Sequence, residues 1–222
     1  QDRTILEAFD DIQRKCDSIQ LSKVISDSAK QLFRRAEEDN IVKSRRTEAT
    51  IAAAIHASCK INEVPRTLSE ISSLTKVKKK VIGRISGRMQ ATFGLIAQGA
   101  QNAVAPTKAL DLVGRFCSRL GLDQAIVRVT EDIVIRVSQA GVLAGKSPVT
   151  IGAACILLAV TMSMANPPSV KAIAESAQVS DSTIKSSYRD MLKRRDIILT
   201  NEFLQKHKRI VDVTRLGPVL NT

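Results

Sequence analysis

The sequence contains one internal repeat at an offset of about 100 residues, and this repeat limits the possible folds more than any other feature. The segment that begins at Cys16 aligns with the segment that begins at Cys117. Three further pairs of corresponding residues are Leu21 and Leu122, Thr50 and Thr150, and Ile82 and Ile184. Because a repeated pattern of apolar residues specifies the same packing twice, we expect two domains of one kind in tandem.

Each repeat has the pattern of an all-helical domain. Apolar residues recur at spacings of three and four, which predicts helices, and strand-like alternation is scarce. In the first repeat we predict helices near Asp2 to Ser18, Ser22 to Asp39, Arg45 to Ile61, Leu68 to Ser73 and Lys78 to Phe93. In the second we predict them near Lys108 to Leu120, Asp123 to Ala140, Pro148 to Met164, Val170 to Ser176 and Asp181 to Arg194. The fold class is therefore all-α, with five helices in each repeat.

The third helix of each repeat is apolar on nearly all sides, which places it at the centre of its domain. Residues 1–94 form the first predicted domain and residues 108–196 the second. Residues 95–107, rich in Gly, Pro and small side chains, are typical of a linker. We expect residues 197–222 to form a partly helical C-terminal tail.

The fourth and fifth helices of each repeat predict a helix-turn-helix arrangement. In the first repeat, Pro65 ends the third helix, and Thr67 with Glu70 forms a T-x-x-E capping box that starts the short fourth helix. A similar start signal precedes the third helix of the second repeat, where Ser147 is a predicted N-cap and Pro148 takes the first helical position. The fifth helix of each repeat is then a candidate to enter a DNA groove with its N-terminal residues.

Basic residues gather on these two fifth helices. Lys78, Lys79 and Lys80 stand at the start of the first one, although cations are disfavoured at that end by the helix dipole, so we expect an anionic partner there. The stripe continues through Arg84 and Arg88. In the second repeat, the stripe of exposed cations is expected at Lys185, Arg189 and Lys193.

The two stripes differ where Gly83 and Gly87 correspond to Lys185 and Arg189. Glycine lowers helix propensity but permits close approach of another surface. We therefore interpret the first stripe as a contact to the DNA backbone or minor groove and the second as the better candidate for reading bases. The alternative for either stripe is a solvated basic face that keeps the protein soluble.

The composition agrees with nucleic-acid binding through charge rather than stacking. Lys and Arg number 34 against 22 Asp and Glu, a net charge of +12, which favours an acidic partner. Aromatic residues make up 3% of the chain and Trp is absent, which argues against a stacking platform for bases.

Several other classes of function lack a signal in the sequence. No apolar run approaches the roughly 18 residues of a membrane span, and no secretory leader precedes Gln1, so we expect a soluble, intracellular protein with no membrane partner. The four cysteines stand far apart, which predicts buried thiols rather than a zinc site. His56 on the apolar third helix is expected to be a satisfied core residue. No catalytic set of nucleophile and base is visible, so we predict no enzyme activity.

At these residues the chain resembles the general transcription initiation factor IIB family. The resemblance rests on "VPRTLSEI" and "KKKVIGR" in the first repeat, and on "RFCSRLGL", "GKSPVTIGAACILLA" and "VSDSTIKSSYRDM" in the second. These segments cover almost the whole chain in the order and spacing of the family. The resemblance implies two tandem cyclin-like domains of five helices each.

The same resemblance implies a role as a bridge in transcription initiation. Family cores bind the TATA-binding protein on promoter DNA, touch DNA on both sides of the TATA element and position RNA polymerase II, which implies a nuclear protein. We expect the chain to be monomeric. The zinc ribbon of the family is not in this sequence, so no metal or other cofactor is expected in the chain.

By correspondence with the family, Gly83 and Arg84 belong to the downstream DNA contact. The upstream contacts correspond to Ser182, Thr183, Lys185 and Arg189. In the family, the form of this recognition helix that reads the upstream element best has valine at the position of Ser182 and arginine at that of Lys185. Because lysine acts as a point charge rather than a bidentate fork, we expect phosphate binding rather than strict base reading.

Three basic residues on the helix after the linker are predicted contacts to the acidic edge of the TATA-binding protein; they are Lys108, Arg115 and Arg119. Ordinary solvated surface is the alternative for them. Two alternatives remain for the whole chain: a cyclin that regulates a kinase, and an initiation factor of the polymerase III or archaeal factor B type. A cyclin would carry a tryptophan-containing signature on its first helix, and this sequence has no Trp.

Overall fold

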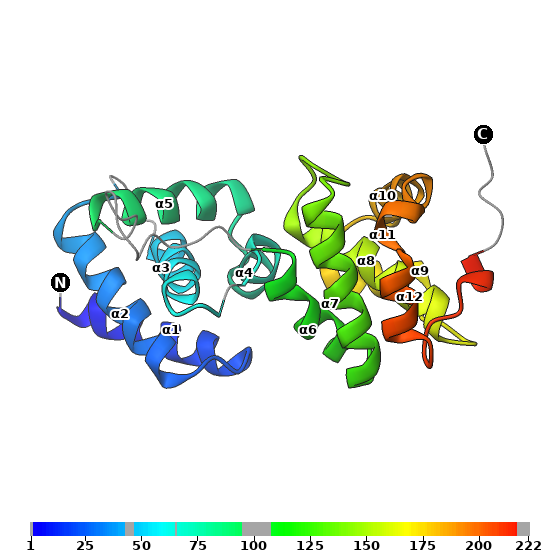
Figure 1. The fold of residues 1–222 in the computed structure, drawn as a ribbon. Coiled ribbons are helices and arrows are strands. Elements are labelled where there is room, and N and C mark those ends of the chain that lie inside the picture. Colours follow the sequence, from blue (N-terminus) through cyan, green and yellow to red (C-terminus); the bar gives the residue numbers. More distant parts are fainter. Residues whose placement is uncertain (1, 43–46, 65, 95–107, 217–222) are drawn as a thin grey trace. The chain divides into compact units, whose positions relative to one another are not determined.

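The computed structural model describes residues 2–42, 47–64, 66–94 and 108–216, and all secondary structure within these ranges is helical (Figure 1). The chain divides into unit 1, residues 1–107, and unit 2, residues 108–222. The all-α prediction is confirmed. The predicted helix start at Arg45, the helix stop at Pro65 and the linker 95–107 lie outside the described residues.

In its described residues, unit 1 is a bundle of five helices, with four of them packed around a central one. The helices are α1 (Asp2–Ser18), α2 (Lys23–Glu38), α3 (Thr47–Ile61), α4 (Leu68–Thr75) and α5 (Lys79–Thr92). Helix α3 packs against the other four, and every residue from Ala49 to Cys59 is buried. Figure 1 shows the other four arranged around α3. A helix with no solvated face must be surrounded in this way, as predicted.

Unit 2 repeats the arrangement around α8. Its first five helices are α6 (Leu110–Arg119), α7 (Gln124–Gln139), α8 (Pro148–Ser163), α9 (Val170–Ala177) and α10 (Asp181–Lys193). Helix α8 packs against the other four and is buried almost throughout. The predicted start signal is present, since the backbone N–H of Thr150 donates to Ser147 Oγ over 3.2 Å and Pro148 is the first helical residue.

Residues 195–216 contribute to the hydrophobic core of unit 2. They form α11 (Arg195–Ile198), α12 (Asn201–His207) and a 3₁₀ turn, η1 (Val213–Leu216). The side chain of Phe203 is 0% exposed within the hydrophobic core of the unit. The prediction of a partly helical C-terminal tail did not include the burial of Phe203.

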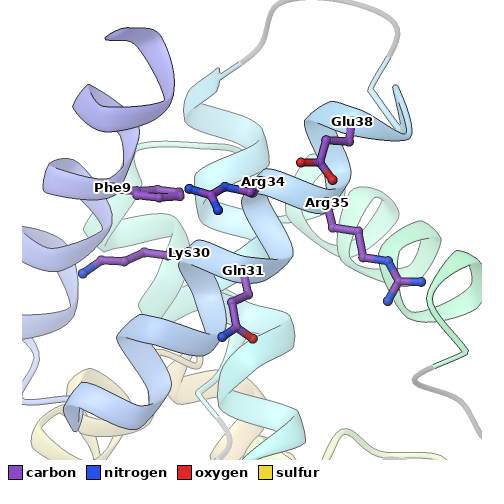
Figure 2. Close-up of a pocket in the computed structure, with 6 residues that line it drawn as sticks. All are labelled: Phe9, Lys30, Gln31, Arg34, Arg35 and Glu38. Carbon is purple, nitrogen blue, oxygen red and sulfur yellow. The ribbon is translucent and has the colours of Figure 1, made fainter. Parts of the chain in front are cut away.

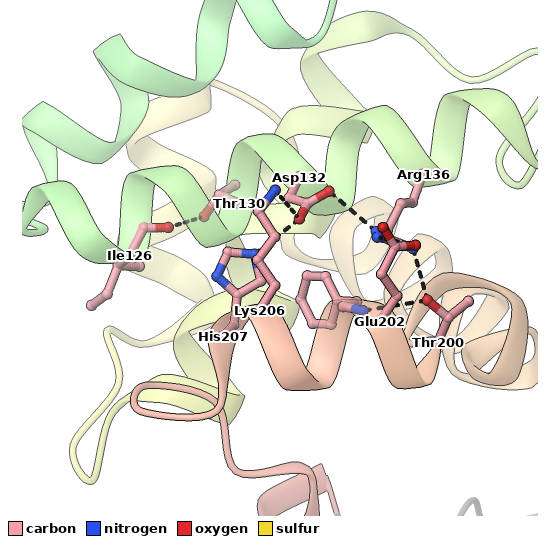
Figure 3. A network of polar contacts seen from close by, with 9 residues as sticks. Ile126, Thr130, Asp132, Arg136, Thr200, Glu202, Lys206 and His207 are labelled. Atoms are coloured by element: carbon pink, nitrogen blue, oxygen red, sulfur yellow. Dashed lines mark hydrogen bonds and ion pairs between the residues drawn. The ribbon is translucent and has the colours of Figure 1, made fainter.

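A polar network on α7 holds α12 in place (Figure 3). The Asp132 carboxylate accepts hydrogen bonds from Arg136 Nε at 3.1 Å and Lys206 Nζ at 3.0 Å, and it lies 2.9 Å from His207 Nε2. Arg136 also donates to Thr200 Oγ1 over 2.9 Å. Burial raises the pKa of the Asp132 carboxyl, but its hydrogen bonds to His207 and Lys206 outweigh burial and leave the pKa below its usual value.

The buried thiols and His56 have structural roles. Cys16, Cys59, Cys117 and Cys155 are all free and buried, as predicted. The Nδ1 atom of His56 lies 2.9 Å from Ser86 Oγ, which ties α3 to α5. Burial, together with the nearby charge of Lys60, lowers the pKa of His56 to about 4, so the imidazole is neutral at pH 7. The prediction of a satisfied core histidine is confirmed.

His56 makes the stability of unit 1 dependent on pH. The pKa of the imidazole is about 4 in the folded state and about 6.5 in the unfolded state. Because the unfolded state binds the proton more tightly, lowering the pH between these values favours unfolding. The free energy of unfolding of unit 1 should be highest above pH 6.5 and should be about 3 kcal/mol lower at pH 4. Urea denaturation of the protein and of His56→Asn across this range measures the effect. Identical pH profiles for the two proteins would contradict it.

Two kinds of feature are not found in the part of the chain that the structure describes. None of its helices combines the length and the apolar character that crossing a membrane requires. No three His, Cys, Asp or Glu side chains in this part are grouped so that they could hold a metal ion.

Candidate nucleic-acid interface

Both units contain the predicted helix-turn-helix, and both turns begin with a left-handed residue. In unit 1 the turn between α4 and α5 begins at Lys76, which has a φ of 58°. The corresponding residue between α9 and α10 is Gln178, with a φ of 55°. Both are left-handed residues at a helix end, where the chain leaves one helix and turns into the next.

Buried isoleucines fix the orientation of α5 and α10. Ile82 on α5 and Ile184 on α10 are fully buried, as are Ile71 on α4 and Ile173 on α9. In each unit the two helices therefore pack through apolar side chains on their inner faces. The opposite face of α5 and of α10 is left to solvent, and that face carries the basic residues.

The starts of the helices are capped differently in the two units. The predicted capping box of α4 is present: Thr67 Oγ1 accepts from the Glu70 N–H at 3.1 Å, and Glu70 accepts from the Thr67 N–H at 2.7 Å. Ser180 caps α10, because its Oγ accepts from the Thr183 N–H at 3.3 Å. At the corresponding position before α5 stands Lys78, whose side chain makes no capping bond. Backbone N–H groups at the start of α5 are thus left for another acceptor.

The basic residues predicted on α5 lie on an uncompensated surface. Lys78, Lys79, Lys80, Arg84 and Arg88 are all exposed. Between residues 71 and 94 the chain has six Lys or Arg, these five and Lys76, and no Asp or Glu. Positive charge at a helix start opposes the helix dipole, so this surface favours an anion both through its side chains and through its backbone.

The candidate residues of α10 are also brought to the surface, with less excess charge. Ser182, Lys185 and Arg189 are exposed, and Thr183 is half-buried with its Oγ1 2.7 Å from Ser180 Oγ. Exposed Lys193 continues the stripe. Asp181 and Asp190 stand on the same helix and reduce its net positive charge. The surface of α10 therefore presents hydroxyl groups together with cations. A mixed surface of this kind can contact base edges as well as phosphates, whereas a purely cationic surface mainly contacts phosphates.

Neither glycine of α5 is required by packing inside unit 1. A Cβ at Gly83 would lie 3.5 Å from Leu68 Cδ1, an ordinary contact, and a Cβ at Gly87 would meet nothing within 4 Å. Both residues have helical backbone, so they do not serve a turn. Packing within unit 1 therefore does not account for glycine at these positions.

Replacing Gly87 by alanine should therefore stabilise unit 1. We expect the free energy of unfolding to rise by about 0.5–1 kcal/mol, because alanine restricts the unfolded chain and fits the helix. Chemical denaturation measures the gain. In the same protein, binding to promoter DNA should weaken if the backbone of α5 approaches DNA closely. A stability gain without any loss of DNA binding would contradict the close-approach interpretation.

The three predicted partner contacts have unlike surroundings. Lys108 is exposed at the start of α6. The guanidinium of Arg115 lies 5.9 Å from the ring centroid of Phe116. Arg119 Nη1 donates to the carbonyl oxygen of Ser176 over 2.8 Å, which ties α6 to the helix-turn-helix of unit 2. Arg119 therefore also positions α9, and the partner role of all three stays a prediction.

Ser180 caps α10 but was not among the predicted site residues. The usable signal is a serine directly before the first residue of a predicted helix, followed three residues later by Thr183. Gln178 was missed for a different reason, since a left-handed glutamine has no signature in the sequence.

Comparison with known proteins matches both repeats. The family model described as "Transcription factor TFIIB repeat" matches residues 1–91 and 102–194. Transcription initiation factor IIB from Schizosaccharomyces pombe is 36% identical over 198 residues, which cover 85% of this chain and 58% of the relative. The Xenopus laevis factor of the same name is 31% identical over 202 residues, covering 91% and 61%.

An archaeal relative matches as well. Transcription initiation factor IIB 1 from Thermoplasma volcanium is 30% identical over 193 residues, covering 87% of this chain and 59% of the relative. The chain thus spans about 60% of the length of these relatives. Since the family model matches each helical unit once and includes both helix-turn-helix pairs, the chain belongs to the transcription factor TFIIB repeat family.

Proposed function

We propose that this chain is the core of a general transcription initiation factor of the RNA polymerase II system. In this role it binds the TATA-binding protein on promoter DNA, contacts DNA on both sides of the TATA element and bridges to RNA polymerase II in the nucleus. The core acts through binding alone and catalyses no reaction. The curated relatives carry the name transcription initiation factor IIB, which supports the general role.

One observation carries the proposal for DNA contact. Each unit has a helix-turn-helix whose second helix is anchored by a fully buried isoleucine and turns an exposed set of cations outward. A single basic helix is a common surface feature, but here the second helix of the pair carries exposed cations in both repeats, although at positions that do not align. Two such helices can contact DNA at two separate places. This arrangement suits a protein that contacts the duplex on both sides of another bound protein.

The DNA contacts of the two helices are proposed to differ in the part of the duplex that they touch. Helix α5 offers cations, glycines and an uncapped helix start, so it suits phosphate and close backbone contact. Helix α10 offers Ser182, Lys185 and Arg189 on one capped helix, so it suits a groove. We assign α5 to the downstream side of the TATA element and α10 to the upstream side. Lys108, Arg115 and Arg119 are assigned to the TATA-binding protein.

A gel-shift experiment tests the proposal. A labelled promoter fragment with a TATA element is mixed with the chain, with and without the TATA-binding protein. We expect a strong additional shift only when the TATA-binding protein is present, and a steep loss of that shift as salt rises, because bound cations release counterions from DNA. Equal binding to random DNA with and without the TATA-binding protein would contradict the bridging role.

A further inference from the structure

A buried polar cluster joins the middle of α5 to the central helix of unit 1. The Nδ1 atom of His56 on α3 lies 2.9 Å from Ser86 Oγ on α5, and Gln90 Nε2 donates to the same oxygen over 3.0 Å. All three side chains are buried, and Ser86 is 1% exposed. Because apolar side chains of the same shape would give similar stability, these hydrogen bonds indicate that the contact between α3 and α5 needs a defined direction.

The cluster lies opposite the basic face of α5. Successive residues of a helix are about 100° apart around its axis, so Ser86 stands about 160° from both Arg84 and Arg88. Those two cations are exposed, whereas Ser86 faces α3. Any rotation of α5 about its axis therefore moves the hydrogen bonds on one side and the cations on the other side together.

A hydrogen bond restricts this rotation more strictly than apolar packing does. Apolar contacts are non-directional, and a core of suitable volume keeps its stability even when it loses a unique arrangement. A hydrogen bond weakens steeply when its geometry is distorted. A rotation of α5 by about 20° would move a group about 6 Å from the axis by about 2 Å. That displacement is enough to break a hydrogen bond to a phosphate, since such bonds span about 3 Å.

The far end of α5 is held by a different kind of contact. A surface cavity of about 240 Å³ is lined by residues of α1 and α2, and there the Arg34 guanidinium lies 5.2 Å from the ring centroid of Phe9. Figure 2 shows the neighbouring Arg35 side chain extending away from Phe9. The guanidinium of Arg35 lies 4.4 Å from the ring centroid of Phe93, directly after α5. A stacked cation holds this end of α5 near α2 but restricts rotation about the helix axis less than a hydrogen bond does.

The corresponding helix of unit 2 is fixed differently. His56 corresponds to Ile156, which is fully buried and has no polar side-chain atom, so the hydrogen bond of His56 cannot be repeated on α8. The start of α10 is instead held by the cap from Ser180, whereas Lys78 before α5 makes no side-chain capping bond. A helix without a side-chain cap depends more on the contacts of its middle, which increases the importance of the cluster for α5.

We propose that His56 and Ser86 are positioning residues for the downstream DNA contact. They set the rotation of α5 about its axis, and thereby the direction of Arg84 and Arg88, while neither touches DNA itself. This inference rests on the proposed assignment of α5 to the downstream side of the TATA element. Since the cluster lies within unit 1, its two hydrogen-bonding groups should govern DNA contact on that side alone.

Hydroxyl-radical footprinting and gel shifts of the complex with the TATA-binding protein and promoter DNA test the proposal. His56→Leu removes the hydrogen-bonding ring at similar volume, and Ser86→Ala removes the hydroxyl group. We expect each variant to weaken the complex about tenfold and to lose the downstream protection while it keeps the upstream protection. His56→Asn keeps a polar atom near the position of Nδ1, so it should retain the affinity within about twofold and keep both protections.

A destabilised control separates positioning from a general loss of stability. Ala8 is buried on α1, which packs against α2 and α3, and glycine destabilises a helix interior. Ala8→Gly should lower the midpoint of urea denaturation at least as much as Ser86→Ala does, and yet keep the protection on both flanks.

Three results would overturn the positioning role. They are equal loss of downstream protection in Ala8→Gly and Ser86→Ala, equal loss in His56→Asn and His56→Leu, and full downstream protection in both His56→Leu and Ser86→Ala. Downstream protection that is missing already from the unaltered protein would contradict the proposed function as well.

Discussion

Replacing Phe203 by alanine is expected to lower the free energy of unfolding of unit 2 by about 3–5 kcal/mol. The ring is fully buried, and it packs against the imidazole of His207 with centroids 4.7 Å apart and lies under the guanidinium of Arg136 at 5.4 Å. Removing it leaves a cavity between α12 and the rest of the unit and exposes the Asp132 network to water. Urea denaturation followed by circular dichroism measures the loss.

A control on the preceding helix shows whether the loss comes from burial. Ile197 on α11 is 52% exposed, so Ile197→Ala should change stability by less than about 1 kcal/mol. A small effect of Phe203→Ala, equal to that of Ile197→Ala, would mean that α12 is a loosely attached tail. That result would contradict the placement of Phe203 in the core.

Replacing Lys78, Lys79 and Lys80 together by alanine is expected to weaken the complex with the TATA-binding protein and promoter DNA by about 10²-fold near 0.15 M salt. Each lysine that neutralises a phosphate contributes about 0.9 to the slope of log affinity against log salt, so the slope should fall by about 2 to 3. The fold should not suffer, because all three side chains are exposed and cations are disfavoured at a helix start. Gel-shift titrations at several salt concentrations measure both quantities.

A charge-matched control separates a specific contact from bulk charge. Arg3, Lys23 and Arg14 are exposed cations on α1 and α2, and replacing all three by alanine removes the same charge from unit 1. That variant should keep the affinity within a few-fold and keep the salt slope. An equal loss of affinity in the two triple variants would contradict a specific role for the start of α5.

Helix positions, the central helices and the helix-turn-helix pairs could be predicted from the sequence because each rests on a local rule or on the repeat. The apolar pattern alone places α3 and α8 at the centres of their units. The T-x-x-E spacing at Thr67 gives the start of α4, and the box is present. The repeat then transfers each assignment to the other half, so two weak signals support one interpretation.

The parts that could not be predicted depend on contacts between residues far apart in sequence. Asp132 and His207 are separated by 75 positions, and no local pattern in the sequence marks the two residues as partners. The cation over Phe9 likewise joins two helices, and neither Phe9 nor Arg34 stands in a recognisable motif. Local rules and repeat comparison therefore miss both the attachment of α12 and the cavity of unit 1.

Footprinting of the complex with the TATA-binding protein on promoter DNA tests most directly whether the two repeats contact the two sides of one site. Hydroxyl-radical cleavage should show protection on both flanks of the TATA element beyond that given by the TATA-binding protein alone. Arg84→Ala should remove the downstream protection and leave the upstream one, and Lys185→Ala should do the reverse. Protection on neither flank, or the same loss on both flanks with either variant, would contradict the account.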